Sequence, residues 1–167
     1  MKISPFFMSL RMNIEIERKF LVKDDSFKGM SVAKHYLKQG YLCVDKHRTV
    51  RIRIADDKGF ITIKGISNKV GMSRFEWERE ISVPEANDLL NLALPTIIEK
   101  VRYIIPSGER FWEIDEFFGE NEGLLLAEIE LGSESEAFEI PTFIGQEVTS
   151  DAKYYNSYLS QNPFKSW

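Results

Sequence analysis

Several features that mark common classes of protein are missing from this sequence. Its 167 residues include one cysteine, Cys43, so no disulfide can form within the chain, and a reducing compartment is the natural expectation. The two histidines, His35 and His47, are too few and too badly spaced to form a zinc site. No apolar run approaches the ~18 residues that a membrane-spanning helix requires. We therefore expect a cytoplasmic protein with no membrane partner.

An excess of positive charge is also missing. The chain has 22 Lys and Arg residues against 26 Asp and Glu, and nonspecific binding to a nucleic acid duplex requires a net basic surface. We therefore expect no nucleic acid partner. The sequence also contains no phosphate-binding glycine-rich loop, no nucleophile elbow and no histidine-centred triad, which excludes the motifs of several large enzyme classes.

The chain shows no linker and no internal repeat, and its length is typical of one domain. Residues 1–11 are mildly apolar, but Pro5, Ser9 and Arg11 interrupt the apolar core that a signal peptide would need. We expect residues 1–11 to be an N-terminal extension ahead of a start at Met12, with an ordered extra strand as the alternative. Residues 12–167 are predicted to form a single domain.

A period of two dominates the sequence, and alternate side chains on a strand face opposite sides of a sheet. Short turn signals separate the patterned segments, which favours antiparallel hairpins. The predicted strands are Asn13–Val22, Gln39–Asp45, Thr49–Ala55, Gly59–Ile66, Ser73–Val83, Thr96–Ile105, Glu109–Phe117 and Leu124–Leu131. Helices are predicted over part of Ser26–Leu37, over Pro84–Leu94 and over Asp151–Ser160, the last with Ser150 as its N-cap.

The polar face of these strands is almost entirely ionic, and each strand carries charges of mostly one sign. Glu15 and Glu17 alternate with isoleucines on the first strand, for example, and Arg51 and Arg53 do so on the third. The charged face of an antiparallel sheet is usually solvated, and this interpretation stays open for any single strand. The pattern recurs on seven of the eight predicted strands, although like charges two residues apart repel each other. This recurrence weakens the interpretation of a simple solvated face.

Eight strands joined by short turns tend to close into a barrel, because closure removes the exposed edges. We predict a mainly β protein of the α+β class, built on an eight-stranded closed antiparallel barrel. The apolar faces of the strands would lie outside, covered by helices, and the ionic faces would line a tunnel. About eight strands leave an interior that holds side chains or one small ligand.

A tunnel lined by both signs of charge predicts two kinds of ligand. Arginine offers forked donors to phosphate oxygens and lysine offers a point charge, so the basic positions predict a polyanion. The acidic positions predict a hard divalent cation bound through oxygen, either Mg²⁺ or Mn²⁺. A metal ion and a polyphosphate together fit phosphoryl transfer. The basic positions are Lys19, Arg51, Arg53, Lys64, Lys100 and Arg102.

The segment Glu15-Ile16-Glu17-Arg18-Lys19 resembles the Glu-x-Glu-x-Lys signature of the CYTH superfamily, also called triphosphate tunnel metalloenzymes. One such match is weak evidence, but further similar motifs follow in order, and the resemblance covers roughly Asn13 to Leu159. The chain most resembles the compact bacterial triphosphatases of the superfamily. These motifs are Gln39-Gly40-Tyr41-Leu42, Arg51-Ile52-Arg53, Thr62-Ile63-Lys64, Glu76-Trp77-Glu78, Lys100-Val101-Arg102, Trp112-Glu113-Ile114-Asp115, Leu126-Ala127-Glu128-Ile129-Glu130 and Glu147-Val148-Thr149.

The resemblance implies a tunnel that holds a triphosphate and one or two Mg²⁺ or Mn²⁺ ions, with a C-terminal helix that plugs or covers one mouth. The implied metal ligands are Glu15, Glu17, Asp115, Glu128 and Glu130. The implied phosphate-binding residues are Lys19, Arg51, Arg53, Lys64, Lys100, Arg102 and, on the C-terminal helix, Lys153. The implied catalytic residues are Glu15, Glu17, Lys19, Glu76 and Glu78, of which the last two would hold water or another metal ion.

The leading hypothesis is therefore metal-dependent hydrolysis of a small-molecule triphosphate, inorganic triphosphate first. The superfamily also includes thiamine triphosphatases and class IV adenylyl cyclases, so hydrolysis of thiamine triphosphate and cyclisation of ATP stay open. A noncatalytic module that binds polyphosphate or a nucleotide is a further alternative, although binding alone would not need carboxylates beside phosphate. A homodimer is compatible with the sequence.

Overall fold

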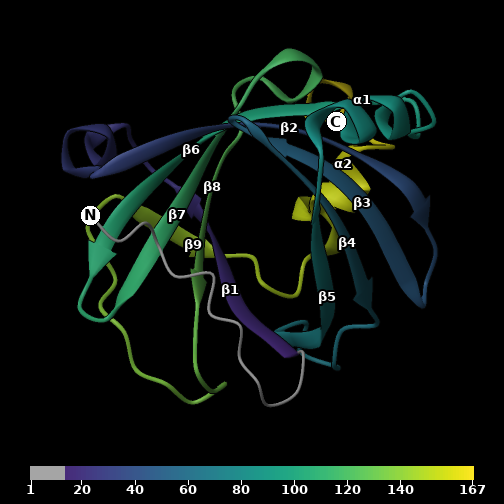
Figure 1. The fold of residues 1–167 in the computed structure, drawn as a ribbon. Helices are drawn as coiled ribbons and strands as arrows, with labels where there is room; N and C mark the ends of the chain where they lie inside the picture. The colour runs from purple at the N-terminus through teal and green to yellow at the C-terminus, as the bar shows by residue number, and fades with distance from the viewer. Residues whose placement is uncertain (1–13) are drawn as a thin grey trace.

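The computed structural model describes residues 14–167, so the predictions for residues 1–11 and for a start at Met12 lie outside the described residues. Nine strands are present in the described part of the chain, and all of them pair antiparallel (Figure 1). They are β1 (Ile14–Val22), β2 (Ala33–Val44), β3 (Arg48–Ala55), β4 (Lys58–Gly65), β5 (Ser73–Ile81), β6 (Ile98–Ser107), β7 (Arg110–Phe117), β8 (Leu125–Glu130) and β9 (Ile144–Glu147).

Eight of these strands form a closed barrel, which confirms the predicted fold. Their order is β5-β4-β3-β2-β6-β7-β8-β1, and β1 returns to pair with β5. The closing seam is short, because β1 pairs with β5 only over Ile14–Ile16, opposite Ser73–Phe75. The ninth strand, β9, adds to the other end of β1 and was not predicted.

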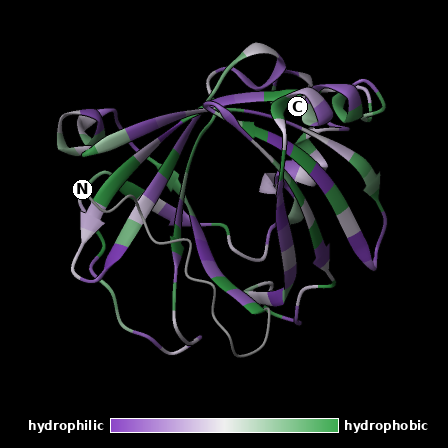
Figure 2. Ribbon diagram, in the orientation of Figure 1, coloured by the Kyte–Doolittle hydropathy of each residue, from purple (hydrophilic) through white to green (hydrophobic). Residues whose placement is uncertain are grey.

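Hydrophilic and hydrophobic residues alternate along the strands, as Figure 2 shows. The hydrophobic side chains of β1, β6, β7 and β8 form an outer core, in which Phe20, Trp112 and Ile129 pack against Phe27 and Phe143. The rings of Phe20 and Trp112 lie 5.4 Å apart in an edge-to-face arrangement, which aromatic pairs favour. A slip of one residue in any strand would turn this apolar face inward, so the outer core also fixes which side chains line the interior.

A second outer core lies under α1 (Val83–Leu90), where Ala86 and Leu90 pack against Ile52 of β3. The helix starts with a capping box, in which Ser82 and Glu85 satisfy each other's backbone N–H groups. It ends four residues before the predicted end at Leu94. The backbone N–H of Leu94 instead donates to the carbonyl of Tyr41 on β2, which pulls the chain back toward the sheet.

The segment before β2 is less helical than predicted. A short 3₁₀ helix, η1 (Ser26–Met30), covers part of the predicted range, but β2 begins at Ala33, six residues before the predicted start at Gln39. Residues 33–39 pair with residues 98–104 of β6. This long-range ladder overrides the local preference of the segment, which no short stretch of sequence can reveal.

The C-terminal helix predicted over Asp151–Ser160 is broken into a 3₁₀ turn, η3 (Ala152–Tyr154), and a single α-helical turn, α2 (Asn156–Leu159). The predicted N-cap, Ser150, is also wrong. The side chain of Asp151 caps the first turn by accepting a hydrogen bond from the backbone N–H of Lys153. Further 3₁₀ turns are η2 (Gly119–Asn121) and η4 (Phe164–Ser166).

The C-terminal segment closes one end of the barrel from within (Figure 1). Leu159 is fully buried and belongs to an apolar cluster with Phe117 and Leu126. These two partners lie two positions from Asp115 and Glu128, so they share the inner face of the barrel with the charged residues. Within residues 14–167, no helix is long and apolar enough to cross a membrane.

Candidate active site

The register of the strands brings the charged positions together on the inner face of the barrel. Side chains directly opposite each other on antiparallel strands are neighbours, so each pairing places two inward side chains side by side. The inward pairs include Glu17–Glu130, Lys19–Glu128, Gln39–Arg53, Lys64–Glu76, Thr62–Glu78 and Arg102–Asp115. The alternation of charged and apolar residues, combined with this register, therefore lines the interior with both acidic and basic side chains.

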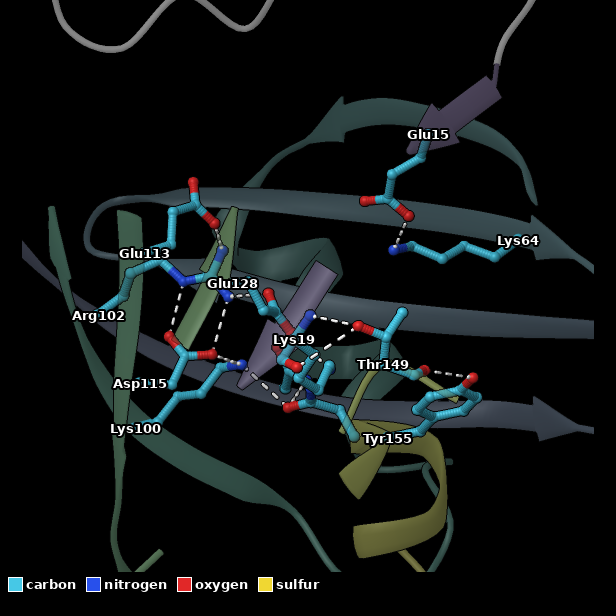
Figure 3. Close-up of polar contacts among 12 residues, drawn as sticks. Glu15, Lys19, Lys64, Lys100, Arg102, Glu113, Asp115, Glu128, Thr149 and Tyr155 are labelled. Carbon is cyan, nitrogen blue, oxygen red and sulfur yellow. Dashed lines mark hydrogen bonds and ion pairs between the residues drawn. The ribbon is translucent and has the colours of Figure 1, made fainter. Parts of the chain in front are cut away.

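Lys100 and Asp115 lie at the centre of a buried ionic network (Figure 3). The Lys100 Nζ atom lies 2.6 Å from Asp115 Oδ2, and the two side chains are 0% and 1% exposed. Arg102 donates to both Asp115 oxygens, at 2.7 and 2.8 Å, and also contacts Glu113. Burial works against the charged form of Asp115, but Arg102 and Lys100 outweigh it and hold the pKa of that carboxyl below its usual value. Burial lowers the pKa of the Lys100 ammonium to about 7.

Lys19 and Glu128 extend this network to β1 and β8. The Lys19 Nζ atom lies 2.5 Å from one Glu128 oxygen, and Arg102 Nη2 lies 3.1 Å from the other. Although burial opposes ionisation, these cations hold the pKa of Glu128 well below its usual value. The chain just after β9 fixes this part of β1, because the backbone N–H of Lys19 donates to the Thr149 hydroxyl at 3.0 Å (Figure 3).

The strands β3, β4 and β5 supply a second group of polar side chains. Arg51 donates to the Thr62 hydroxyl at 3.1 Å, and that hydroxyl donates to Glu78 at 2.6 Å. Two atoms of this group, Arg51 Nε and Glu78 Oε1, are buried without a hydrogen-bond partner among the described residues. A buried unpaired donor and acceptor are costly unless a water or ligand atom joins them, so this corner is suited to a polar ligand.

Arg53 is a half-buried cation without a matching anion. Within residues 14–167 it forms no ion pair, and its Nε atom donates to the neutral amide of Gln39 at 3.0 Å. Burial, together with the positive charges of Arg51 and Arg102, lowers the pKa of Arg53 to about 10. An anion bound in the tunnel would relieve this repulsion.

Glu17 and Glu130 show the opposite imbalance. Burial and the negative charges of neighbouring carboxylates, Glu15 first, raise the pKa of Glu130 to about 7. Burial and the charge of Glu128 likewise raise the pKa of Glu17. Neither carboxylate forms an ion pair with any residue between 14 and 167. Such a pair needs a proton or a cation, and its oxygen atoms suit a hard divalent metal ion.

This acidic pair is not a complete metal site by itself. Across residues 14–167, no three acidic, histidine or cysteine side chains converge closely enough to hold a metal ion. The other predicted ligands are engaged with bases: Glu15 with Lys64 at 2.5 Å, and Asp115 and Glu128 as described above. A metal ion bound at this site would therefore compete with lysine and arginine for these carboxylates.

Most of the predicted site residues line the interior, but Lys153 lies apart from them. Its side chain is exposed, and its Nζ atom lies 4.0 Å from the centre of the Trp167 ring. Three further residues that were not predicted also join the network. Arg74 lies 3.6 Å from Glu15 and shares the inward parity of Glu76, which was a usable signal. Gln39 and Asn156 are the others, and the unbroken helix predicted over Asp151–Ser160 gave no reason to select Asn156.

Comparison with known proteins gives consistent results. The CYTH domain family model matches residues 13–159. An inorganic triphosphatase of Acetivibrio thermocellus is 48% identical over 157 residues, which cover 93% of this chain and 99% of that protein. An inorganic triphosphatase of Nitrosomonas europaea is 36% identical, over 87% of this chain and 96% of that protein. The crystal structure of an inorganic triphosphatase superposes with a TM-score of 0.62 at 33% identity, over 87% of this chain and 93% of the other.

Proposed function

Because the chain belongs to the CYTH domain family, we propose that it is a metal-dependent enzyme that hydrolyses inorganic triphosphate. The observation that carries this proposal is that one barrel contains both a basic side chain and acidic side chains without ion-pair partners among the described residues. Within residues 14–167, Arg53 is a half-buried cation that forms no ion pair, and Glu17 and Glu130 are carboxylates that form none either. A triphosphate together with a divalent metal ion would satisfy both. Two relatives named inorganic triphosphatase support the choice of substrate.

The basic side chains of the interior would bind the phosphate oxygens. Arginine gives forked donors and lysine a point charge, so a row of both can follow a short polyphosphate chain. Several of these bases are now paired with carboxylates, and phosphate oxygens would replace those partners without any change in fold. The set is Lys19, Arg51, Arg53, Lys64, Lys100 and Arg102.

The carboxylates on the facing strands would hold the metal ion. The oxygens of Glu15, Glu17, Asp115, Glu128 and Glu130 suit Mg²⁺ or Mn²⁺, which neutralises phosphate charge and lowers the pKa of bound water. On β5, the free Glu78 Oε1 atom would accept a proton from a water molecule, while Glu76 adds negative charge nearby. That water oxygen would bond to a terminal phosphorus as the anhydride bond breaks, which releases phosphate and diphosphate.

Phosphate release from a panel of substrates tests this function. Inorganic triphosphate, thiamine triphosphate, ATP and longer polyphosphate are compared with Mg²⁺ and with Mn²⁺. We expect inorganic triphosphate to give the highest kcat/KM. Cyclic nucleotide formed from ATP, or tight triphosphate binding without turnover under either metal, would contradict the proposal.

Two variants connect the activity to the site. Glu17→Gln removes a charge from the acidic pair and should abolish metal-dependent turnover, whereas Arg53→Ala should weaken binding and turnover together. Glu120→Gln, at an exposed position in η2, is the matched control and should behave as the parent. If Glu17→Gln hydrolyses triphosphate at the parental rate, the assignment of the acidic pair is wrong.

We also propose a cytoplasmic location, which the single cysteine supports. A homodimer is the oligomeric state that we would test first, by light scattering of the purified chain. The proposed single domain starts at Met12, and limited proteolysis followed by intact-mass measurement would check where the stable domain begins.

A further inference from the structure

The C-terminal plug contacts the ionic network through one side-chain amide. Asn156, the first residue of α2, accepts hydrogen bonds from Lys100 Nζ at 2.9 Å and from Gln39 Nε2 at 3.2 Å. Gln39 in turn accepts from Arg53 Nε at 3.0 Å. Two neutral amides therefore connect Arg53 on β3 with Lys100 on β6.

The donors at the two ends of this chain fix the orientation of both amides. The Nε atom of arginine can only donate, so the oxygen of Gln39 must face Arg53 and its NH₂ group must face Asn156. The ammonium group of Lys100 can also only donate, so the oxygen of Asn156 must serve both neighbours. No flipped arrangement of either amide would satisfy both donors.

We propose that Asn156 is a positioning residue that holds Lys100 directly, and Arg53 through Gln39, in the arrangement that binds phosphate. This inference rests on the proposed function and assigns part of the binding site to the plug. Lys153, the C-terminal base that the sequence favoured, has no such contact with the network and points to Trp167.

The two bases need this support for different reasons. Lys100 is fully buried on a flexible stem, and in residues 14–167 its ammonium group has two hydrogen-bond acceptors, Asp115 at 2.6 Å and Asn156 at 2.9 Å. Asn156 therefore supplies the second contact that fixes the direction of this ammonium group. Arg53 forms no ion pair in the same part of the chain, so the amide of Gln39 is what aims its guanidinium group. A displacement of about 1 Å in such groups can cost as much as a hundredfold in rate.

The experiment is a double-mutant cycle with Asn156→Ala, Gln39→Ala and the double variant. Turnover of inorganic triphosphate is measured with Mg²⁺, together with the thermal midpoint of each protein. Ser157→Ala is the control on the same turn, because residue 157 contributes its backbone carbonyl, which accepts from Ser160, to the hydrogen bonds of the plug.

We expect each single variant to lose about tenfold to a hundredfold in kcat/KM while its thermal midpoint stays within a few degrees of the control. The double variant should lose less than the product of the two single losses, because both substitutions release Arg53 through the same chain of hydrogen bonds. The proposal would be overturned if the loss of kcat/KM in the double variant equalled the product of the two single losses. It would also be overturned if kcat/KM fell only in proportion to a fall in the thermal midpoint.

A binding measurement separates this inference from the proposed function. Calorimetry with inorganic triphosphate and EDTA reports on the bases without requiring hydrolysis. If the parent binds triphosphate but does not hydrolyse it, the proposed function fails, and weaker binding by Asn156→Ala and Gln39→Ala would still support the positioning role. If the parent hydrolyses triphosphate and both variants match it in affinity and rate, the positioning role fails alone. If either variant does not fold, the other one decides the question.

Discussion

At the scale of the residue, the interior of the barrel holds charges that its own partners do not balance. Arg53 has a neutral amide where an anion would be expected, and Glu130 faces Glu17 across the β1–β8 ladder. Most of the other charged side chains on the inner face form ion pairs with one another. Both kinds of unbalanced charge lie on the inner face of one barrel, which is why a ligand that carries both signs, such as a metal–triphosphate complex, fits this interior better than a simple anion does.

The raised pKa of Glu130 should make the free energy of unfolding depend on pH. Its pKa is raised from an ordinary value of 4.5 to about 7, so the folded state binds this proton more tightly than the unfolded state. The resulting stabilisation is complete below about pH 4.5 and is lost as the pH rises through 7. Glu130→Gln, which stays neutral, should therefore exceed the parent in stability at pH 8 by about 1 kcal/mol, a figure reduced to allow for solvent screening.

Urea unfolding in EDTA at several pH values checks this expectation. The difference between Glu130→Gln and the parent should vanish near pH 4.5, where both side chains are neutral. The exposed variant Glu120→Gln should show no comparable trend. A constant difference across the pH range would mean that the effect of the substitution is not electrostatic.

The residues that the sequence revealed are those whose position follows from alternation. Glu15, Glu17 and Lys19 share one face of a strand by spacing alone, and the register then brings Glu130 and Glu128 opposite two of them. Asn156 could not be found in this way. Its role depends on how a broken helix enters the barrel, which is decided by the burial of Leu159 and the packing around it.

At the scale of the element, a glycine, Gly71, allows the turn before β5 to pack closely against the C-terminal segment. Gly71 has a φ of +76°, and a Cβ atom there would lie 2.8 Å from the Tyr155 hydroxyl. That hydroxyl donates to the Thr149 carbonyl at 3.1 Å. Gly71→Ala should therefore destabilise the protein by about 1–3 kcal/mol, through backbone strain and displacement of Tyr155.

A matched glycine separates these two contributions. Gly108 has a φ of +59° with open space around its Cβ direction, so Gly108→Ala reports the backbone contribution alone. Thermal or urea unfolding should rank Gly71→Ala as clearly less stable than Gly108→Ala. Equal effects would show that the contact with Tyr155 carries no energetic weight.

The elements that could be predicted are the ones with a sustained period of two. The barrel strands satisfy this condition over most of their length. The first half of β2 was missed because its pairing with β6 lies about 65 residues away in sequence. The strand β9 was missed because four residues, Ile144–Glu147, are too few to show a period.

At the scale of the whole molecule, ligand binding and stability should be coupled strongly. A ligand that binds only the closed barrel adds about 2.7 kcal/mol at a concentration one hundred times its dissociation constant. For a domain of this size we expect Mg²⁺ with triphosphate to raise the thermal midpoint by roughly 5–10 °C. A scan with a nonhydrolysable triphosphate analogue measures this shift without turnover.

The same scan on Arg53→Ala and Glu17→Gln gives the control. Each variant should keep a stable fold and lose most of the shift, because each removes one of the unbalanced charges. The exposed variant Glu120→Gln should keep the full shift. An unchanged shift in Arg53→Ala would contradict the assignment of that residue to phosphate binding.

The way in which β1 closes the barrel has a consequence for synthesis on the ribosome. Of the described strands, the one that bears Glu15, Glu17 and Lys19 emerges before the others, yet its main partner, β8, lies more than a hundred residues later in the chain. At the usual pace of translation, β1 waits on the order of ten seconds for that partner. Among the described strands, the one that carries these three proposed site residues is therefore made before its main partner by the longest interval, and such long-range closure makes for slow folding. Until β8 appears, the aromatic and aliphatic side chains on the outer face of β1 are available to chaperones.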